Sequence, residues 1–299
     1  MPARPNHLLC FGFGFSARTL AALLPHGSWR ITGTSRTDAG CEAIRAMGYE
    51  AHVFNDDVSL DRSVLRDVTH IVVSAPPGKS CDPVLAVHRD DLAKSAPSLR
   101  WLAYLSTTGV YGGRNGGWVD EASPLDPSTS RGKARLEAET AWLDLWRAHG
   151  VPVHLFRLAG IYGPGRNQIE TVRAGTARRI IKPGQMFSRI HVADIAAILL
   201  ASLKHPNPGS AYNVCDDETC PPQDVVAYAC ELLGVEPPPE IAFDDAELSP
   251  MAKSFYAESK RVSNEKVKRE LGYKFIYPSY REGLKALAHD LEQGEKQSG

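Results

Sequence analysis

The chain has 299 residues, 34 basic and 35 acidic side chains, and a formal net charge of -1. This length predicts one large domain or two fused lobes, and 43% hydrophobic residues suffice for a core, which excludes wholesale disorder. The balanced charge argues against a nucleic-acid-binding protein, because such proteins usually carry a basic excess. No uninterrupted apolar run reaches about 18 residues, so we expect no membrane contact.

The N-terminal segment loosely resembles a signal peptide, with Arg4 before an apolar stretch at residues 8–24. Glycines, a serine and Arg18 interrupt that stretch, and no small-residue cleavage site follows it. We therefore expect a first strand and helix there, and a cytoplasmic protein. The six cysteines include no Cys-x-x-Cys pair, which predicts reduced, mostly buried thiols and no metal site.

The first half of the chain alternates short apolar runs with helical patterns. Strands are expected at residues 7–11, 29–33, 51–54, 69–74, 99–106 and 151–158. Helices are expected between the first two strands up to Leu24, and at residues 38–47, 84–96 and 131–149. Strands that alternate with helices predict βαβ units. The expected fold class is therefore α/β, a Rossmann-type doubly wound parallel sheet.

After Gly163 proline and glycine become frequent, and strands are hard to place. Helices are expected at residues 192–203, 222–233 and 279–293, with a short one before Gly272 and a flexible tail at 294–299. This change predicts a smaller, interleaved C-terminal substrate lobe at 166–189 and 216–293. The dinucleotide-binding domain would take residues 1–165 and 190–215.

A glycine-rich turn follows the first strand. Residues 12–17 read GFGFSA and fit the pattern G-x-G-x-x-G/A. The first glycine permits a tight turn, the second lets the backbone approach a pyrophosphate, and the small third residue lets the helix pack closely. The helix N-terminus then offers free N–H groups to the phosphates. The expected cofactor contacts here are Gly12, Gly14, Phe15, Ser16 and Ala17.

The end of the second strand indicates which dinucleotide binds. An NAD site usually carries Asp or Glu there, but this chain has Ser35, Arg36 and Thr37. Arg36 suits a 2′-phosphate, and the two flanking hydroxyls suit it as well. The alternative is a solvated surface arginine. We therefore expect NADP as the cofactor, with NAD possible.

Four segments, in the family's order, resemble the extended short-chain dehydrogenase/reductase family, the NAD-dependent epimerase/dehydratase group. They read GFGFSA at 12–17, LSTTGVYG at 105–112, FRLAGIYGPG at 156–165 and RIHVAD at 189–194. The resemblance implies a nicotinamide cofactor, a small-molecule substrate and a possible homodimer. It also implies that the turn Ser74, Ala75 and Pro76 lines the nicotinamide ribose.

The family's catalytic set is Ser/Thr, Tyr and Lys. The resemblance places Thr107 at the hydroxyl position and Lys133 at the lysine position, where the lysine also binds the nicotinamide ribose. The tyrosine position is Thr129, and no tyrosine lies between Tyr111 and Tyr162. An aliphatic hydroxyl is a far weaker acid than a phenol, so Thr129 is a poor proton donor. The chain looks most like the atypical members that lack this tyrosine.

Other groups are candidates for the proton transfer. Asp120, Glu121 and His191 are the three considered, each with a structural role as its alternative. The Asp-Glu pair that follows the Thr in the family's dehydratases is absent, which disfavours sugar-nucleotide dehydration. Five arginines are candidates for binding an anionic substrate or for a solvated basic face: Arg166, Arg173, Arg178, Arg179 and Arg189.

Two functions follow. The first is an NADP-binding oxidoreductase or epimerase-like enzyme acting on a carbonyl, a hydroxyl or a sugar-nucleotide-like molecule, with an altered proton-transfer group. The second is a catalytically silent NAD(P)-binding sensor or regulatory protein. Trp142 and Trp146, four residues apart, predict packing or a helix-mediated dimer interface rather than a cofactor box.

Overall fold

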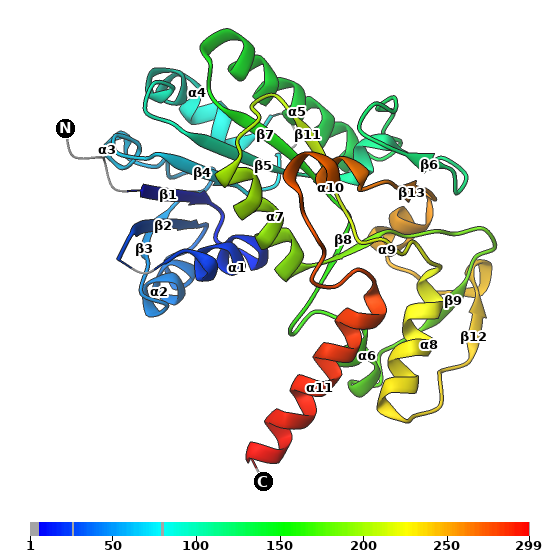
Figure 1. Ribbon diagram of the computed structural model, residues 1–299. Helices are drawn as coiled ribbons and strands as arrows, with labels where there is room; N and C mark the ends of the chain where they lie inside the picture. The colour runs from blue at the N-terminus through cyan, green and yellow to red at the C-terminus, as the bar shows by residue number, and fades with distance from the viewer. Residues whose placement is uncertain (1–5, 26, 79–80, 299) are drawn as a thin grey trace. The chain divides into compact units, whose positions relative to one another are not determined.

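The computed structural model describes residues 6–25, 27–78 and 81–298. The chain divides into two compact units, each of which is assembled from separate stretches of the sequence (Figure 1). The first unit comprises Met1–Val110, Ser130–Arg157 and Ile195–Tyr212, and the second comprises Tyr111–Thr129, Leu158–Asp194 and Asn213–Gly299.

This division differs from the boundaries expected from the sequence. Four stretches assigned above to the dinucleotide-binding domain belong to the second unit: 111–129, 158–165, 190–194 and 213–215. The chain leaves the first unit at Arg157, near the end of the strand that runs from Val153 to Leu158, and not at the later Gly-Pro turn. The boundary therefore follows the end of a strand more closely than the change in composition.

The first unit is built on a seven-stranded sheet in the order β3-β2-β1-β4-β5-β7-β11. The strands are β1 (Asn6–Phe11), β2 (Trp29–Ser35), β3 (Glu50–Val53), β4 (His70–Val73), β5 (Trp101–Thr107), β7 (Val153–Leu158) and β11 (Ala211–Val214). β1 pairs in parallel with β2 and β4, β2 with β3, and β4 with β5. This order is that of the doubly wound fold, and it confirms the predicted fold class.

Helices connect these strands. They are α1 (Phe15–Leu23), α2 (Asp38–Ala46), α3 (Arg62–Leu65), α4 (Pro83–Ser95), α5 (Ser130–His149) and α7 (Val192–Lys204). Thr37 caps α2 and Asp82 caps α4, each by accepting a backbone N–H in the first turn. Trp142 is fully buried in the core between the sheet and α4 and α5, and Trp146 packs against that core. The packing role predicted for these tryptophans is confirmed.

The second unit contains short elements. They are η1 (Thr108–Tyr111), β6 (Trp118–Val119), β8 (Gly160–Tyr162), α6 (Gln168–Arg173), β9 (Arg179–Ile181), β10 (Arg189–His191), α8 (Pro222–Leu233), β12 (Glu240–Ala242), η2 (Phe243–Asp245), α9 (Pro250–Tyr256), β13 (Arg261–Val262), α10 (Glu265–Leu271) and α11 (Tyr280–Ser298). Within the described residues, β8 pairs with β10, β9 with β12, and β6 with β13. Ile169, Val225, Tyr280 and Leu284 form the core of α6, α8 and α11.

The last helix corrects one expectation. α11 continues to Ser298, so residues 294–298 are helical instead of forming the flexible tail predicted from Gly294, and Gly299 lies outside the described residues. One glycine costs a helix only about 1 kcal/mol relative to alanine, which the flanking helix-forming residues offset.

Three further findings concern the cysteines, membrane-spanning helices and metal-binding clusters. All six cysteines are free, and five of them are buried, with Cys81 exposed. Across the described part of the chain, no helix combines the length and the apolar character needed to cross a bilayer. The same residues contain no cluster of three or more His, Cys, Asp or Glu side chains arranged to hold a metal ion.

Candidate functional site

The turn after β1 needs a glycine at position 12. Gly12 has φ +84°, a conformation that L side chains rarely adopt. A Cβ atom there would lie 2.8 Å from Ser74 Oγ and 3.2 Å from the Ala75 backbone nitrogen. The Gly12 N–H donates to Thr34 Oγ1 on β2 at 2.9 Å, a contact that the sequence pattern did not reveal. The turn is therefore fixed by both neighbouring strands.

The N-terminus of α1 is open to a ligand. Gly14 is the cap residue, is exposed, and makes no side-chain hydrogen bond to the helix. A Cβ atom at Gly14 would meet nothing within 4 Å, so there is room beside the backbone at this position. Ser16 and Ala17 are buried against the sheet and Phe15 is half-buried. These residues fit a dinucleotide pyrophosphate, which helix N-termini favour.

The end of β2 carries the three polar residues expected to select the dinucleotide. The Ser35 Oγ accepts the Thr37 N–H at 3.4 Å, and Thr37 Oγ1 accepts the Gly40 N–H at 3.2 Å at the start of α2. Arg36 is exposed, its backbone carbonyl accepts from Asn55 Nδ2, and its guanidinium makes no ion pair within the described residues. Two of the predicted hydroxyls thus shape the turn, and the arginine side chain is available.

The end of β4 reaches the glycine turn directly. Ser74 Oγ donates to the Gly12 carbonyl oxygen at 2.7 Å, and the Ser74 and Ala75 N–H groups both donate to the Phe11 carbonyl oxygen. Pro76 follows and is exposed. Because β4 is parallel to β1, this predicted segment and the glycine turn lie at the same edge of the sheet.

Thr107 is the last residue of β5 and is half-buried. Its Oγ1 accepts the Gly109 N–H at 3.1 Å. A hydroxyl has one proton to donate and two lone pairs to accept with, so this bond leaves the Thr107 proton directed elsewhere. β5 pairs in parallel with β4, so Thr107 also lies at the carboxyl edge of the sheet.

Helix α5 is tied to β5 by the residue two positions after Lys133. Arg135 Nη1 donates to the Leu105 carbonyl oxygen at 2.8 Å and to Tyr104 Oη at 3.0 Å. Lys133 lies in the first turn of α5 and is exposed, with no ion pair within the described residues. Thr129, at the tyrosine position, is half-buried and directly precedes α5.

A buried ion pair fixes α5 against β7. Arg157 donates to both oxygens of Glu139, with Nη2 to Oε2 at 2.8 Å and Nε to Oε1 at 3.1 Å. The side chains are 6% and 2% exposed. A guanidinium and a carboxylate that pair side by side fix each other's orientation. Arg157 belongs to a motif quoted above, but its partner on α5 gave no sequence signal.

The three proposed alternatives to tyrosine are engaged in the second unit. Glu121 Oε1 accepts the Asn213 N–H at 2.7 Å, and Asp120 Oδ1 accepts from Ala122 N and Ser123 Oγ in its own turn. His191 is buried, and burial lowers its pKa to about 4. An imidazole with a pKa of about 4 is unprotonated at neutral pH, so it has no extra proton to donate. Asp120 and Glu121 thus have structural roles, and His191 is buried and neutral.

Asp194, the last residue of the segment RIHVAD, also has a structural role that the sequence did not reveal. Asp194 Oδ1 accepts Tyr273 Oη at 2.6 Å and the Ile276 N–H at 2.7 Å, and Oδ2 accepts the Tyr277 N–H at 3.2 Å. The carboxylate thus holds the loop before α11. Burial raises its pKa, and these three donors oppose that rise.

The five candidate arginines do not form one group. Arg179 pairs with Glu240 at 2.7 Å, and Arg178 Nη1 donates to the Glu247 carbonyl oxygen. Arg189 Nη1 donates to the Phe187 carbonyl oxygen. Arg166 and Arg173 are exposed. Arg178, Arg179 and Arg189 therefore hold structural partners.

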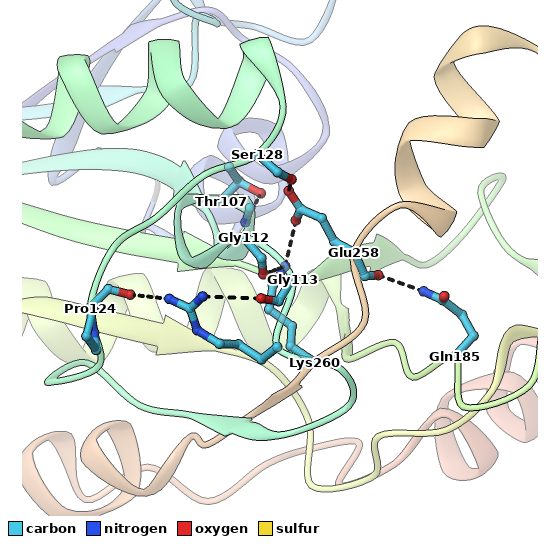
Figure 2. Close-up of polar contacts among 10 residues, drawn as sticks. Thr107, Gly112, Gly113, Pro124, Ser128, Gln185, Glu258 and Lys260 are labelled. Atoms are coloured by element: carbon cyan, nitrogen blue, oxygen red, sulfur yellow. Dashed lines mark hydrogen bonds and ion pairs between the residues drawn. The ribbon is translucent and has the colours of Figure 1, made fainter.

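Sequence reasoning missed a buried lysine and glutamate in the second unit, which Figure 2 shows with their partners. Lys260 Nζ donates to Glu258 Oε2 at 2.7 Å and to the Gly112 carbonyl oxygen at 2.9 Å. Ser128 Oγ donates to Glu258 Oε1 at 2.8 Å. Ser128 lies 130 positions from Glu258 and Gly112 lies 148 positions from Lys260, so no local sequence pattern predicts these two contacts.

Comparisons with known proteins agree with this geometry. Residues 90–215 match the NAD dependent epimerase/dehydratase family. The chain is 28% identical to Protein YeeZ of Escherichia coli (strain K12), over 89% of this chain and 94% of that protein. It is 52% identical, with a TM-score of 0.88, to the structure of a functionally unknown conserved protein from Silicibacter pomeroyi DSS, covering 96% and 99% of the two chains.

A more distant structure shares the fold. The dTDP-glucose 4,6-dehydratase from Bacillus anthracis str. Ames, in complex with NAD, superposes with a TM-score of 0.76 at 19% identity, covering 98% of each chain. The strand order, the glycine turn and the family match lead to one assignment. Residues 90–215 carry the domain of the NAD dependent epimerase/dehydratase family, and the chain as a whole shares the fold of the dTDP-glucose 4,6-dehydratase structure.

Proposed function

We propose that the protein is an NAD(P)-dependent oxidoreductase or epimerase-type enzyme with an altered proton-transfer group. Its substrate is a small molecule with a carbonyl or hydroxyl group, and sugar-nucleotide-like molecules are included. The observation that carries the proposal is the open helix N-terminus at Gly14 together with the Thr107 hydroxyl at the same edge of one parallel sheet. A coenzyme and a reacting oxygen bind at such edges in doubly wound folds.

Each candidate site residue of the first unit has a proposed role. When bound, the nicotinamide group exchanges a hydride with the substrate carbon. The N–H groups at the start of α1 bind the pyrophosphate, and Lys133 binds the nicotinamide ribose. Thr107 donates its free proton in a hydrogen bond to the substrate oxygen, because the Gly109 N–H already occupies one of its acceptor sites.

We also propose that NADP is preferred over NAD. The exposed Arg36 side chain and the absence of an acidic residue at the end of β2 support this preference. Replacing Arg36 by alanine should weaken NADPH binding about tenfold or more and leave NADH binding within about twofold. Arg147→Ala is the matched control, since it removes an exposed arginine from the last turn of α5, at the opposite edge of the sheet. Tighter NADH than NADPH binding in the unmodified chain would contradict the preference.

Turnover tests the enzyme itself. The probe is a panel of aldehydes, ketones and dTDP- and UDP-hexoses, followed by NADPH absorbance in one direction and NADP reduction in the other. Thr107→Val keeps the shape and removes the hydroxyl, so kcat should fall about 100-fold with NADPH affinity retained. Lys133→Met should weaken NADPH binding. Indifference of turnover to both changes would remove this mechanism.

One observation favours the second candidate, a binding or regulatory protein without turnover. Thr129 stands at the position of the proton-donating tyrosine. NADPH binding with no consumption across the whole panel would identify such a protein. Absence of binding to either dinucleotide would exclude both candidates.

A further inference from the structure

Arg36 lies in the short connection between β2, which ends at Ser35, and α2, which begins at Asp38. Its side chain is exposed, and an exposed arginine has many rotamers open to it. The direction in which this side chain leaves the backbone is set by the two peptide groups that flank the residue. A residue that fixes those peptide groups therefore decides which positions the guanidinium can reach.

The loop after β3 holds both of these peptide groups. β3 pairs in parallel with β2, up to Val53 opposite Ser35, so the two strands end side by side in the first unit (Figure 1). The Phe54 N–H donates to the Ser35 carbonyl oxygen at 2.8 Å, which fixes the peptide group before Arg36. Asn55 Nδ2 donates to the Arg36 carbonyl oxygen at 2.9 Å, which fixes the peptide group after it.

Of these two bonds, only the one from Asn55 depends on the identity of a side chain. Phe54 donates through its backbone N–H, which every residue except proline has. The other end of the Asn55 amide is occupied as well, because its Oδ1 accepts the Asp57 N–H at 2.9 Å and the Val58 N–H at 2.8 Å. These two accepted bonds place the oxygen, and they thereby direct the NH2 group toward Arg36.

The loop that carries Asn55 is anchored in the core of the first unit. The Asn55 N–H donates to the Val58 carbonyl oxygen at 3.1 Å, which closes the segment 55–58 on itself. Phe54 is buried, and its ring centroid lies 5.2 Å from that of Phe11 and 5.9 Å from that of His88. Asn55 thus extends from a fixed loop toward an exposed turn, and it can order that turn.

The peptide group that joins Arg36 to Thr37 is bonded at both ends. Its carbonyl oxygen accepts from Asn55, and its N–H donates to Ser35 Oγ at 3.4 Å. The Asn55 bond is the shorter of the two, and its donor lies 19 positions away in the chain. An arginine whose backbone is already ordered loses less conformational freedom when it binds a phosphate. This order should favour a ligand with a phosphate near Arg36 over one without it.

We propose that Asn55 is a positioning residue for the choice of dinucleotide, which holds the Arg36 backbone where the guanidinium reaches the 2′-phosphate of NADP. This inference rests on the proposed function, and within it on the preference for NADP. The effect of Asn55 passes through Arg36, so it should disappear when Arg36 is replaced. NADH has a hydroxyl where NADPH has the 2′-phosphate, and it should bind equally well with or without Asn55.

The test is a double-mutant cycle on the full chain, with Kd values for NADPH and NADH measured by fluorescence titration. Asn55→Ser removes the donor to Arg36, while the serine hydroxyl can still accept the N–H groups of its own turn. NADPH binding should weaken about fivefold, and NADH binding should stay within about twofold. In the Arg36→Ala background, the same change at position 55 should alter NADPH binding by less than about twofold.

Asn6→Ala is the matched control. Asn6 also bonds through its side chain, by accepting from Arg100 Nη1 at 3.0 Å, but it lies at the amino end of β1. Both Kd values should be unchanged in this variant. If Asn55→Ser does not fold, Asn55→Thr takes its place in the cycle, because it offers the same hydroxyl in a side chain closer in size to asparagine.

A second measurement isolates the phosphate. Adenosine 2′,5′-bisphosphate and 5′-AMP differ only by the 2′-phosphate, and neither contains nicotinamide. Asn55→Ser should weaken binding of the bisphosphate about fivefold and leave binding of 5′-AMP within about twofold. Equal losses for the two nucleotides would show that Asn55 supports the turn in general and does not act on the phosphate.

The outcomes are distinct. The role of Asn55 is overturned, and the proposed function stays intact, if Asn55→Ser weakens NADPH and NADH equally or weakens NADPH by the same factor with and without Arg36. It is also overturned if NADPH binding depends on Arg36 but is unchanged in Asn55→Ser. An unmodified protein that prefers NADH, or whose NADPH binding survives Arg36→Ala, overturns the NADP preference and the role of Asn55 with it.

Discussion

The Ser74 hydroxyl donates to the Gly12 carbonyl oxygen at 2.7 Å, which ties the end of β4 to the turn after β1. A side chain at position 12 would lie against that same hydroxyl. Because Gly12 has no Cβ, the Ser74 hydroxyl can lie close enough to bond its carbonyl oxygen. This bond holds the backbone of the turn at the edge of the sheet. A ligand phosphate could then approach the start of α1.

Gly12→Ala should both strain the turn and block it. A left-handed alanine costs about 1–2 kcal/mol, and the contacts with Ser74 and Ala75 add to this cost. Gly48→Ala is the control, because Gly48 has φ +85° and nothing within 4 Å of a Cβ. Urea unfolding and NADPH titration should show a larger loss of stability at position 12, and lost binding there alone. Equal effects of the two changes would contradict this account.

Breaking the buried pair of Glu139 and Arg157 should be costly. Glu139→Leu leaves a buried guanidinium without its carboxylate, and we expect a loss of about 3–5 kcal/mol in the free energy of unfolding. The double variant Glu139→Leu/Arg157→Met replaces the pair by apolar side chains and should regain much of that loss. Denaturant unfolding of all four proteins measures the coupling. Additive effects of the two single changes would show that the residues act independently.

His154 should make the first unit sensitive to acid. The Asn207 N–H donates to His154 Nε2 at 2.9 Å, which requires that nitrogen to be unprotonated, and burial lowers the pKa of the ring to about 4. The unfolded chain binds this proton near pH 6.5, so its stabilising effect is complete above that pH and is lost as pH falls toward 4. Thermal unfolding of His154→Gln should depend less on pH over this range. An identical pH dependence in the two proteins would contradict it.

Asp216 should have the opposite pH dependence. The side chain is 2% exposed, and burial raises its pKa to about 8. The folded protein holds this proton while the unfolded chain releases it near pH 4, so stability declines as pH rises from about 4 to 8. Asp216→Asn should therefore raise the Tm at pH 8 by about 2–4 °C for each kcal/mol recovered, and change it little at pH 4.5. A Tm gain that is the same at both pH values would argue against this cause.

Local patterns predicted the first unit well because its elements are long enough to show a period. β1, β2, β4 and β5 lie within a few residues of their expected positions, and the conformation of Gly12 follows from its place in the motif. The contribution of Thr34 was not visible, because a threonine in a strand looks the same whether or not it accepts a bond from a turn 22 positions away.

The second unit was less predictable for a related reason. β6 and β13 contain two residues each and pair across more than 140 positions, too short for an alternating pattern and too distant for a hairpin signal. The Lys260 ammonium and the Gly112 carbonyl are 148 positions apart. Folding brings such groups together through contacts that no window of sequence contains. The candidate proton donors chosen from the sequence lie near a motif, whereas the ion pair of Lys260 and Glu258 lies far from any motif.

The chain passes between its two units after Val110, Thr129, Arg157, Asp194 and Tyr212. No single cut therefore releases either unit as a continuous polypeptide. A fragment that ends at residue 165 lacks α7 and β11, and one that begins there lacks β6 and the Gly112 partner of Lys260. During synthesis the sheet stays incomplete until residues 211–214 have emerged from the ribosome. A frameshift or stop before that point should leave no folded remnant, so nascent chains of increasing length should gain protease resistance late and in one step.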